Sequence, residues 1–301
     1  GFAGRNTIGL RAEFLSDYLR EGFSLFADIL CNPAFDKKEV QKEKNLQLQA
    51  LKDQEDALSR LAFINFLKEL FPQHPYGLRA LGSKTSVGKL NSAILASSWK
   101  QQMIGGNLTI SIVGKVNTAE IKKLAEEFLS QLPKGKSKRL KIKTDPKPKA
   151  IKFIETKKPD RKQAHIVLGS RGPSLIDKDY HAYVVMNNIL SGQGGRLFLE
   201  LRDKMGLAYS VSSILQPGFD PGHFAVYIGT DPTKIDTAVN AMKIELEKIS
   251  TKLVSKAELN RAKQYLVGTY ELELQRNSSL SSNYTFNELY GFGLEEMQAY
   301  P

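Results

Sequence analysis

The sequence predicts an α+β protein made of two copies of one unit, each a mainly antiparallel sheet packed with helices. Amphipathic helical patterns cover most of the chain. The strand-like runs are few and short, and two of them are spaced as a hairpin. A third observation concerns Glu39 and Glu258, which lie 219 positions apart (258 minus 39), each in a capping box that follows an amphipathic helix. This offset indicates an internal duplication.

The first elements of the chain are predicted to be helical. Leucine and phenylalanine recur at helical spacing over residues 15–31, and Asn32-Pro33 ends that pattern. A capping box at Asp36 opens a long helical stretch that is predicted to continue towards Leu70. The chain therefore begins with two predicted helices, the second much longer than the first.

One strand and one helix complete the first half. The run 109–113 is rich in β-branched residues and follows a glycine pair, so it is predicted to be a buried strand. Residues 118–132 have the pattern of an amphipathic helix, and Pro133 ends it.

A basic segment divides the chain. The net charge is +11, and its excess is concentrated at Lys134, Lys136, Lys138, Arg139, Lys141, Lys143, Lys147, Lys149 and Lys152. Prolines and a glycine interleave, as in linkers. No aromatic residues interleave for base stacking, so a linker at 134–150 between domains 1–133 and 151–301 is favoured over a nucleic-acid-binding arm. Nonspecific nucleic-acid binding stays an alternative.

The second half alternates strands and helices. In chain order the patterns predict a strand at 164–168, a helix at 177–190, a helix from Gly195 to Gly206, a hairpin of 209–215 with 224–228, and helices at 232–250 and 255–275. A second capping box, Ser255 with Glu258, opens the last helix. If the repeating unit is about as long as the offset, the first copy lacks its opening and the second lacks its end. We therefore expect the native polypeptide to extend beyond Gly1 and Pro301.

Composition excludes several classes of protein. Charged residues interrupt every helical stretch before about 20 apolar residues accumulate, so no membrane span is predicted. Cys31 is the single cysteine, which excludes an internal disulfide and a cysteine-based zinc site, and leaves the cytoplasm and the periplasm open as compartments. The four histidines, His74, His165, His181 and His223, include no pair at helical metal-binding spacing, and no Gly-x-Ser-x-Gly elbow is present.

The string from Gly194 to Ser213 closely resembles the signature of the C-terminal-type domain of the pitrilysin/insulinase family, which includes the mitochondrial processing peptidases. Residues 14–82, with the stretches 27–35, 39–43 and 74–77, resemble the later part of the preceding unit. The resemblance implies duplicated LuxS/processing-peptidase-like metallohydrolase units, in agreement with the offset found above.

Active members of this family carry an inverted His-x-x-Glu-His zinc helix on one unit and, on a partner unit, an arginine and a tyrosine seven residues apart that hold the substrate. Arg202 and Tyr209 have that spacing. Both side chains donate hydrogen bonds, so together they suit a peptide carbonyl and the oxyanion derived from it. The structural alternative is an arginine paired with Glu200 or Asp203 and a tyrosine packed at the start of a strand.

The zinc side departs from the family pattern. The zinc histidines are expected upstream of Gly1, and the downstream glutamate ligand is expected seven residues after a glutamate matching Glu43. Ala50 stands at that position and cannot bind a metal. The resemblance thus implies no catalytic or metal-binding residue in this chain, with zinc expected on a partner unit.

These observations predict the non-catalytic half of a pitrilysin-like zinc metalloendopeptidase, which helps to enclose a peptide-binding chamber and supplies Arg202 and Tyr209 to a zinc site elsewhere. The implied partners are an unfolded peptide substrate, a zinc-bearing catalytic unit in the same polypeptide or in a partner subunit, and a second copy of the chain in a homodimer. The alternative is a catalytically dead scaffold or peptide-binding module of the same fold.

Overall fold

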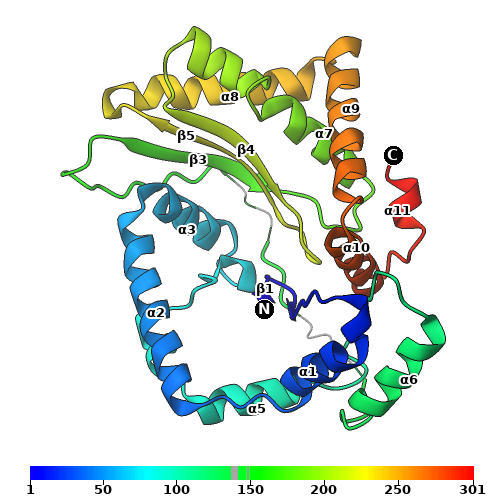
Figure 1. The fold of residues 1–301 in the computed structure, drawn as a ribbon. Helices are drawn as coiled ribbons and strands as arrows, with labels where there is room; N and C mark the ends of the chain where they lie inside the picture. The colour runs from blue at the N-terminus through cyan, green and yellow to red at the C-terminus, as the bar shows by residue number, and fades with distance from the viewer. Residues whose placement is uncertain (137–141, 147, 149) are drawn as a thin grey trace. The chain divides into compact units, whose positions relative to one another are not determined.

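The computed structural model describes residues 1–136, 142–146, 148 and 150–301 (Figure 1). The predicted linker at 134–150 therefore lies partly outside the described residues. The chain divides into two compact units. Unit 1 comprises residues 1–49, 83–141 and 269–301, and unit 2 comprises residues 50–82 and 142–268. Residues 50–82 thus belong with the second half of the chain, although they precede the basic segment.

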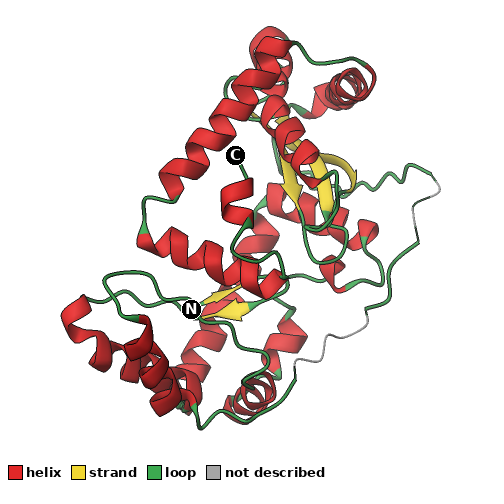
Figure 2. Cartoon of the chain, turned by 90° about the vertical axis from the view of Figure 1, so that its right-hand side faces the viewer, coloured by secondary structure: helices red, strands yellow, loops and turns green. Residues whose placement is uncertain are grey.

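The described residues form mainly helices, with two small antiparallel sheets drawn yellow in Figure 2. The helices are α1 (Leu19–Cys31), α2 (Lys37–Asp56), α3 (Leu58–Leu70), α4 (Lys84–Gly88), α5 (Ser92–Gln102), α6 (Thr118–Leu129), α7 (Tyr180–Leu190), α8 (Ile235–Thr251), α9 (Lys256–Glu273), α10 (Asn277–Tyr290) and α11 (Glu296–Ala299), with short 3-10 turns η1 (Ser16–Tyr18), η2 (Pro75–Gly77) and η4 (Pro232–Lys234) and a π-helix, η3 (Phe198–Lys204). The strands are β1 (Phe2–Ala3), β2 (Ile8–Gly9), β3 (Ala164–Arg171), β4 (Ser210–Gln216) and β5 (His223–Thr230). The predicted α+β class is confirmed.

Unit 1 packs α1 against α6. Phe23 and Ala27 of α1 lie in one cluster with Leu124 of α6, and all three are buried. Apolar residues at helical spacing on both helices form this contact, as the periodicity predicted. The short strands β1 and β2 pair antiparallel, with Phe2 opposite Gly9.

The predicted strand at 109–113 is wrong. The structure assigns no strand there, and the backbone oxygen of Ser111 accepts a hydrogen bond from Ser281 Oγ at 3.1 Å. β-branched residues favour extended backbone, but a strand also needs a neighbour that accepts and donates main-chain hydrogen bonds. No strand in the described ranges pairs with residues 109–113.

The long helix predicted from Asp36 towards Leu70 is two helices. Ala57 separates α2 from α3, with φ −84° and ψ 97°. Its N–H still donates to Asp53 O at 3.1 Å and its C=O still accepts from Leu61 N at 3.0 Å, so the break lies in a single ψ angle. There is no proline or glycine at this position. The sequence pattern therefore predicted one continuous helix.

Unit 2 is built on a three-stranded sheet in the order β3-β5-β4, with both pairings antiparallel. The predicted hairpin of 209–215 with 224–228 is confirmed as β4 and β5. Figure 1 shows α7 and α8 on one face of the sheet and α3 on the other. Val226 and Ile228 of β5 are fully buried against Leu190 of α7 and Met242 of α8, which together form the main core of the unit.

No helix in the described part of the chain combines the length and the apolar character needed to cross a membrane.

Candidate functional site

The signature string builds a turn, a π-helix and the start of a strand, all within unit 2. Gly192 has φ +81° and turns the chain after α7. The main-chain bonds from Met205 N to Glu200 O at 3.1 Å and from Leu207 N to Leu201 O at 2.9 Å are longer-range than those of an α-helix. The predicted helix is therefore present as a π-helix. π-Helices are rare in proteins, and those that occur are often found at functional sites.

Buried leucines hold this segment in place. Leu197 and Leu201 are 0 % and 1 % exposed, and Leu207 follows them into the same core of unit 2. Because these three side chains point inward, the remaining faces of η3 are directed to the surface.

Arg202 and Tyr209 lie on that surface. The Arg202 side chain is exposed, and its guanidinium carbon lies 4.8 Å from the centre of the Phe198 ring. Tyr209 is 64 % exposed, and its backbone N–H donates to Gly229 O at 2.9 Å. Within the described residues, neither side chain forms a hydrogen bond or an ion pair.

The structure does not show Arg202 paired with Glu200 or Asp203, nor Tyr209 packed into the core, which was the structural alternative for these residues. The Glu200 carboxylate is occupied by Lys204, whose Nζ lies 2.6 Å from Glu200 Oε1. Asp203 forms no ion pair with Arg202 among the residues that the structure describes, and the Tyr209 ring is not packed into the core. The donors of Arg202 and Tyr209 are thus available to a group from outside this unit.

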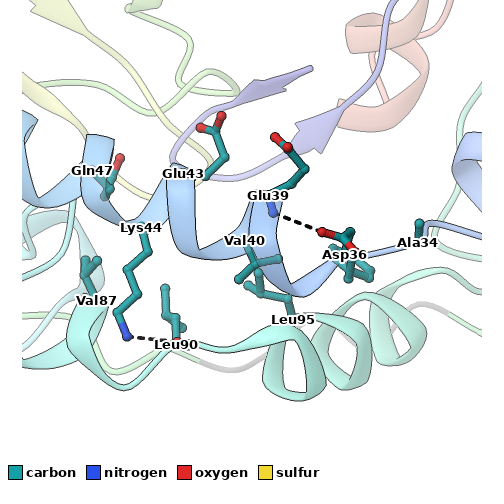
Figure 3. Close-up of a pocket in the computed structure, with 11 residues that line it drawn as sticks. Ala34, Asp36, Glu39, Val40, Glu43, Lys44, Gln47, Val87, Leu90 and Leu95 are labelled. Atoms are coloured by element: carbon teal, nitrogen blue, oxygen red, sulfur yellow. Dashed lines mark hydrogen bonds between the residues drawn. The ribbon is translucent and has the colours of Figure 1, made fainter.

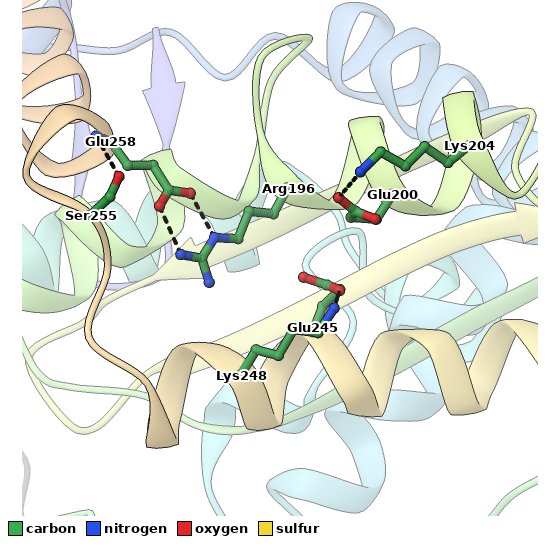
Figure 4. Close-up of polar contacts among 7 residues, drawn as sticks. All are labelled: Arg196, Glu200, Lys204, Glu245, Lys248, Ser255 and Glu258. Carbon is green, nitrogen blue, oxygen red and sulfur yellow. Dashed lines mark hydrogen bonds and ion pairs between the residues drawn. The ribbon is translucent and has the colours of Figure 1, made fainter.

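An ion pair that sequence reasoning missed lies at the start of the π-helix (Figure 4). Arg196 Nε donates to Glu258 Oε1 at 2.6 Å, and its second nitrogen donates to Glu258 Oε2 at 2.8 Å. The two side chains are 20 % and 18 % exposed. These hydrogen bonds lower the pKa of Glu258 and raise the pKa of Arg196. The residues are 62 positions apart, so no local pattern could have revealed the contact.

The same geometry changes the predicted capping box at Ser255. Ser255 Oγ accepts from Glu258 N at 3.2 Å, as predicted, but the Glu258 carboxylate turns to Arg196. Beside it, the buried Glu245 of α8 pairs with Lys248 at 2.6 Å. The start of the signature string is therefore bordered by charges from α8 and α9 (Figure 4).

The residues of α2 do not fit a zinc ion. Ala50 lies two helical turns after Glu43 and supplies no donor atom. Glu43 lines a pocket of about 580 Å³ in unit 1. Figure 3 shows Glu39 and Glu43 pointing away from the apolar wall of Val87, Leu90 and Leu95, and Lys44 pointing towards it. In residues 1–136, 142–146, 148 and 150–301, no group of three or more His, Cys, Asp or Glu side chains is arranged to hold a metal.

Two of the four histidines, His74 and His165, have clear structural contacts. His74 is buried, and its Nδ1 accepts from Tyr76 N at 3.1 Å. His165 of β3 lies with Nδ1 2.8 Å from the hydroxyl of Tyr227. Burial lowers the pKa of His165.

Comparison with known proteins agrees with this geometry. The sequence model of the peptidase M16 inactive domain matches residues 89–266. The chain is 27 % identical over 279 residues to the uncharacterized zinc protease YmxG of Bacillus subtilis, covering 92 % of this chain and 67 % of the relative. It is 29 % identical over 291 residues to the non-peptidase homolog YmxG of Helicobacter pylori, covering 94 % of this chain and 65 % of the relative.

A solved structure shows the same similarity. The peptidase M16 inactive domain from Pseudomonas fluorescens superimposes with a TM-score of 0.82 at 25 % identity, covering 94 % of this chain and 68 % of that one. The chain thus spans about two thirds of the length of these relatives. The resemblance found from the signature string is confirmed, because the matched range contains the whole of it. This chain belongs to the peptidase M16 inactive-domain family.

Proposed function

We propose that this chain is the non-catalytic half of a zinc metalloendopeptidase and that Arg202 and Tyr209 bind the backbone of a substrate peptide for a zinc site on another unit. The observation that carries the proposal is that both side chains are exposed and that neither donates a hydrogen bond to any residue that the structure describes. Both residues lie on a segment in which Leu197, Leu201 and Leu207 are part of the core of unit 2.

The chemistry of the pair suits a peptide carbonyl. The guanidinium of Arg202 carries several N–H donors, and the phenol of Tyr209 carries one O–H donor. Hydrogen bonds from both groups strengthen when negative charge develops on the carbonyl oxygen during attack on the peptide bond. Arg202 and Tyr209 would therefore contribute to catalysis at a centre that another unit supplies.

The sheet of unit 2 offers a way to hold an extended peptide. In the part of the chain that the structure describes, β4 pairs with β5 on one side and with no strand on the other. An extended peptide added to that edge would form main-chain hydrogen bonds without sequence readout. Tyr209 directly precedes β4, so such a peptide would pass the proposed pair.

The test is peptide cleavage by the chain assembled with its zinc-bearing unit, the unit that carries a His-x-x-Glu-His helix. Fluorescein-labelled casein, an unfolded protein, serves as the substrate. Loss of an oxyanion donor costs about 100-fold or more in kcat, so Arg202→Ala and Tyr209→Phe are each expected to reduce kcat to that extent.

Lys204→Ala is the matched control. It removes one positive charge from the same π-helix, but Lys204 pairs with Glu200 instead of facing the proposed site. We expect unchanged cleavage for this variant. Equal cleavage by wild type and by both site variants, with circular dichroism showing that they fold, would refute the proposal.

A second candidate is a catalytically dead scaffold or peptide-binding module. It is favoured by one relative, the Helicobacter pylori protein named a non-peptidase homolog. In that case the assembly binds labelled casein without cleaving it. Arg202→Ala is then expected to weaken casein binding, and there is no cleavage for it to affect. The absence of cleavage by the wild-type assembly, with binding retained, would select this candidate.

A further inference from the structure

The guanidinium of Arg202 lies over the Phe198 ring on the surface of the π-helix. The guanidinium carbon of Arg202 lies 4.8 Å from the centre of the Phe198 ring, within the range of a cation–π interaction. Phe198 opens η3, and the two residues are four apart in the sequence, a spacing that places side chains on one side of a helix.

Phe198 does not belong to the core of unit 2. Leu197, which precedes Phe198, and Leu201, which follows it, both belong to the core cluster of unit 2. Phe198 itself is half-buried and is not part of that cluster. Its ring instead lies against a guanidinium that has no carboxylate partner in the described residues.

The contact has a consequence for the donors of Arg202. A guanidinium is planar, and its N–H groups point outward in that plane. A guanidinium has five N–H donors, and one aromatic ring can be contacted by only some of them, so the others are left to bind another molecule. A long side chain that is already restrained also loses less conformational freedom when it binds.

We propose that Phe198 is a positioning residue for Arg202: its ring holds the guanidinium in the orientation from which Arg202 donates to a peptide carbonyl. This inference rests on the function proposed above and adds a residue to the site. It concerns only the side chains of η3, so part of it can be tested without the zinc-bearing unit.

The first measurement is proton NMR of the 301-residue chain. An aromatic ring shifts nearby protons upfield, so the Arg202 Cδ protons are expected upfield of their ordinary position. Phe198→Leu is expected to abolish this shift and Phe198→Tyr to retain it, because tyrosine keeps the ring face.

The second measurement is the affinity of the same variants for fluorescein-labelled casein by fluorescence anisotropy. Loss of an exposed cation–π contact corresponds to a rise in Kd of about two- to fivefold for Phe198→Leu. Phe198→Tyr is expected to restore wild-type affinity. Leu199→Ala is the matched control, since it truncates a 41 % exposed apolar side chain on the same π-helix and leaves the Phe198 ring in place.

The outcomes separate the two proposals. A wild-type chain with no upfield shift of the Arg202 protons overturns the positioning role. So does a Phe198→Leu variant that loses the shift but binds casein like wild type, when Arg202→Ala binds it more weakly. An upfield shift that depends on Phe198, combined with casein binding and cleavage that do not depend on Arg202, overturns the proposed function instead.

Discussion

Arg196 and Glu258 form a bidentate ion pair that joins the start of the signature segment to the first turn of α9. Two parallel hydrogen bonds of 2.6 and 2.8 Å connect the guanidinium and the carboxylate. Each side chain is about four-fifths buried, so the pair is shielded from water much more than an ordinary surface ion pair. Arg202 lies six positions after Arg196 on the same segment.

Removal of one partner of this pair is expected to destabilise unit 2. Arg196→Met leaves the Glu258 carboxylate without its main donor, at a cost of about 1–3 kcal/mol in the free energy of unfolding. Urea denaturation measures this change. The double variant Arg196→Met with Glu258→Leu is expected to lose less than the sum of the single variants, because no charge is left unpaired.

The exposed pair of Glu200 and Lys204 provides the comparison. Lys204→Met is expected to change the free energy of unfolding by less than about 0.5 kcal/mol, since the Lys204 side chain is 67 % exposed. If Arg196→Met and Lys204→Met lower the free energy of unfolding equally, burial does not make the Arg196–Glu258 pair more stabilising than the exposed pair.

The stability of the protein should depend on pH through Glu258. Its carboxyl ordinarily titrates near 4.5, and hydrogen bonds from Arg196 lower the pKa in the folded state. The stabilisation is therefore fully present above pH 4.5 and is lost as the pH falls from there through the lowered pKa. Thermal unfolding of wild type and Glu258→Gln should show a gap in Tm at neutral pH that narrows in acid. A gap of constant size across this range would contradict the assignment.

Two glycines in unit 2 should respond oppositely to alanine. Gly206 has φ +58° with open space around its Cα, so Gly206→Ala is expected to lose about 1 kcal/mol from the left-handed backbone alone. Gly268 lies within α9, also in open space, so Gly268→Ala is expected to gain about 0.5–1 kcal/mol from helix propensity. Chemical denaturation measures both. Stabilisation by Gly206→Ala would show that the turn between η3 and β4 does not need its left-handed residue.

Introducing at position 50 the glutamate that the resemblance leads us to expect should not create a zinc site. Ala50→Glu would place a carboxylate two turns from Glu43 on α2, but a zinc site needs three protein ligands or more. Metal analysis after dialysis against zinc should therefore find no stoichiometric zinc in either the wild-type chain or the variant. Tight zinc binding by the unsubstituted chain would contradict our account of Ala50.

The sequence predicted the positions of α1, α6, α7, α8 and α9 and of the β4–β5 hairpin because these depend on local periodicity, whereas it gave no prediction for α4, α5, α10 and α11. It did not predict the break at Ala57, which is a single ψ angle without proline or glycine. Nor could it predict that residues 109–113 are not a strand, since strand formation depends on a distant partner. In the second case the missing information is long-range.

The candidate site divides in the same way. Arg202 and Tyr209 were found from a motif and its spacing, and their exposure agrees with a role at the surface. The Arg196–Glu258 pair, the π form of the helix and the contact between Phe198 and Arg202 depend on three-dimensional packing. A sequence pattern predicted Arg202 and Tyr209 as candidate residues, and only the structure showed the contacts around them.

The π-helix also bears on how this segment would respond to a change in its length. A π turn holds one residue more than an α turn, so deletion of one residue within Phe198–Lys204 would let the segment relax into an ordinary α-helix. The residues on either side would keep nearly the same direction relative to one another, because the α turn closes without the residue that widens the π turn. The long main-chain bonds from Met205 N to Glu200 O and from Leu207 N to Leu201 O would be replaced by the shorter-range bonds of an α-helix. The extra residue therefore sets the width of the turn that carries Arg202.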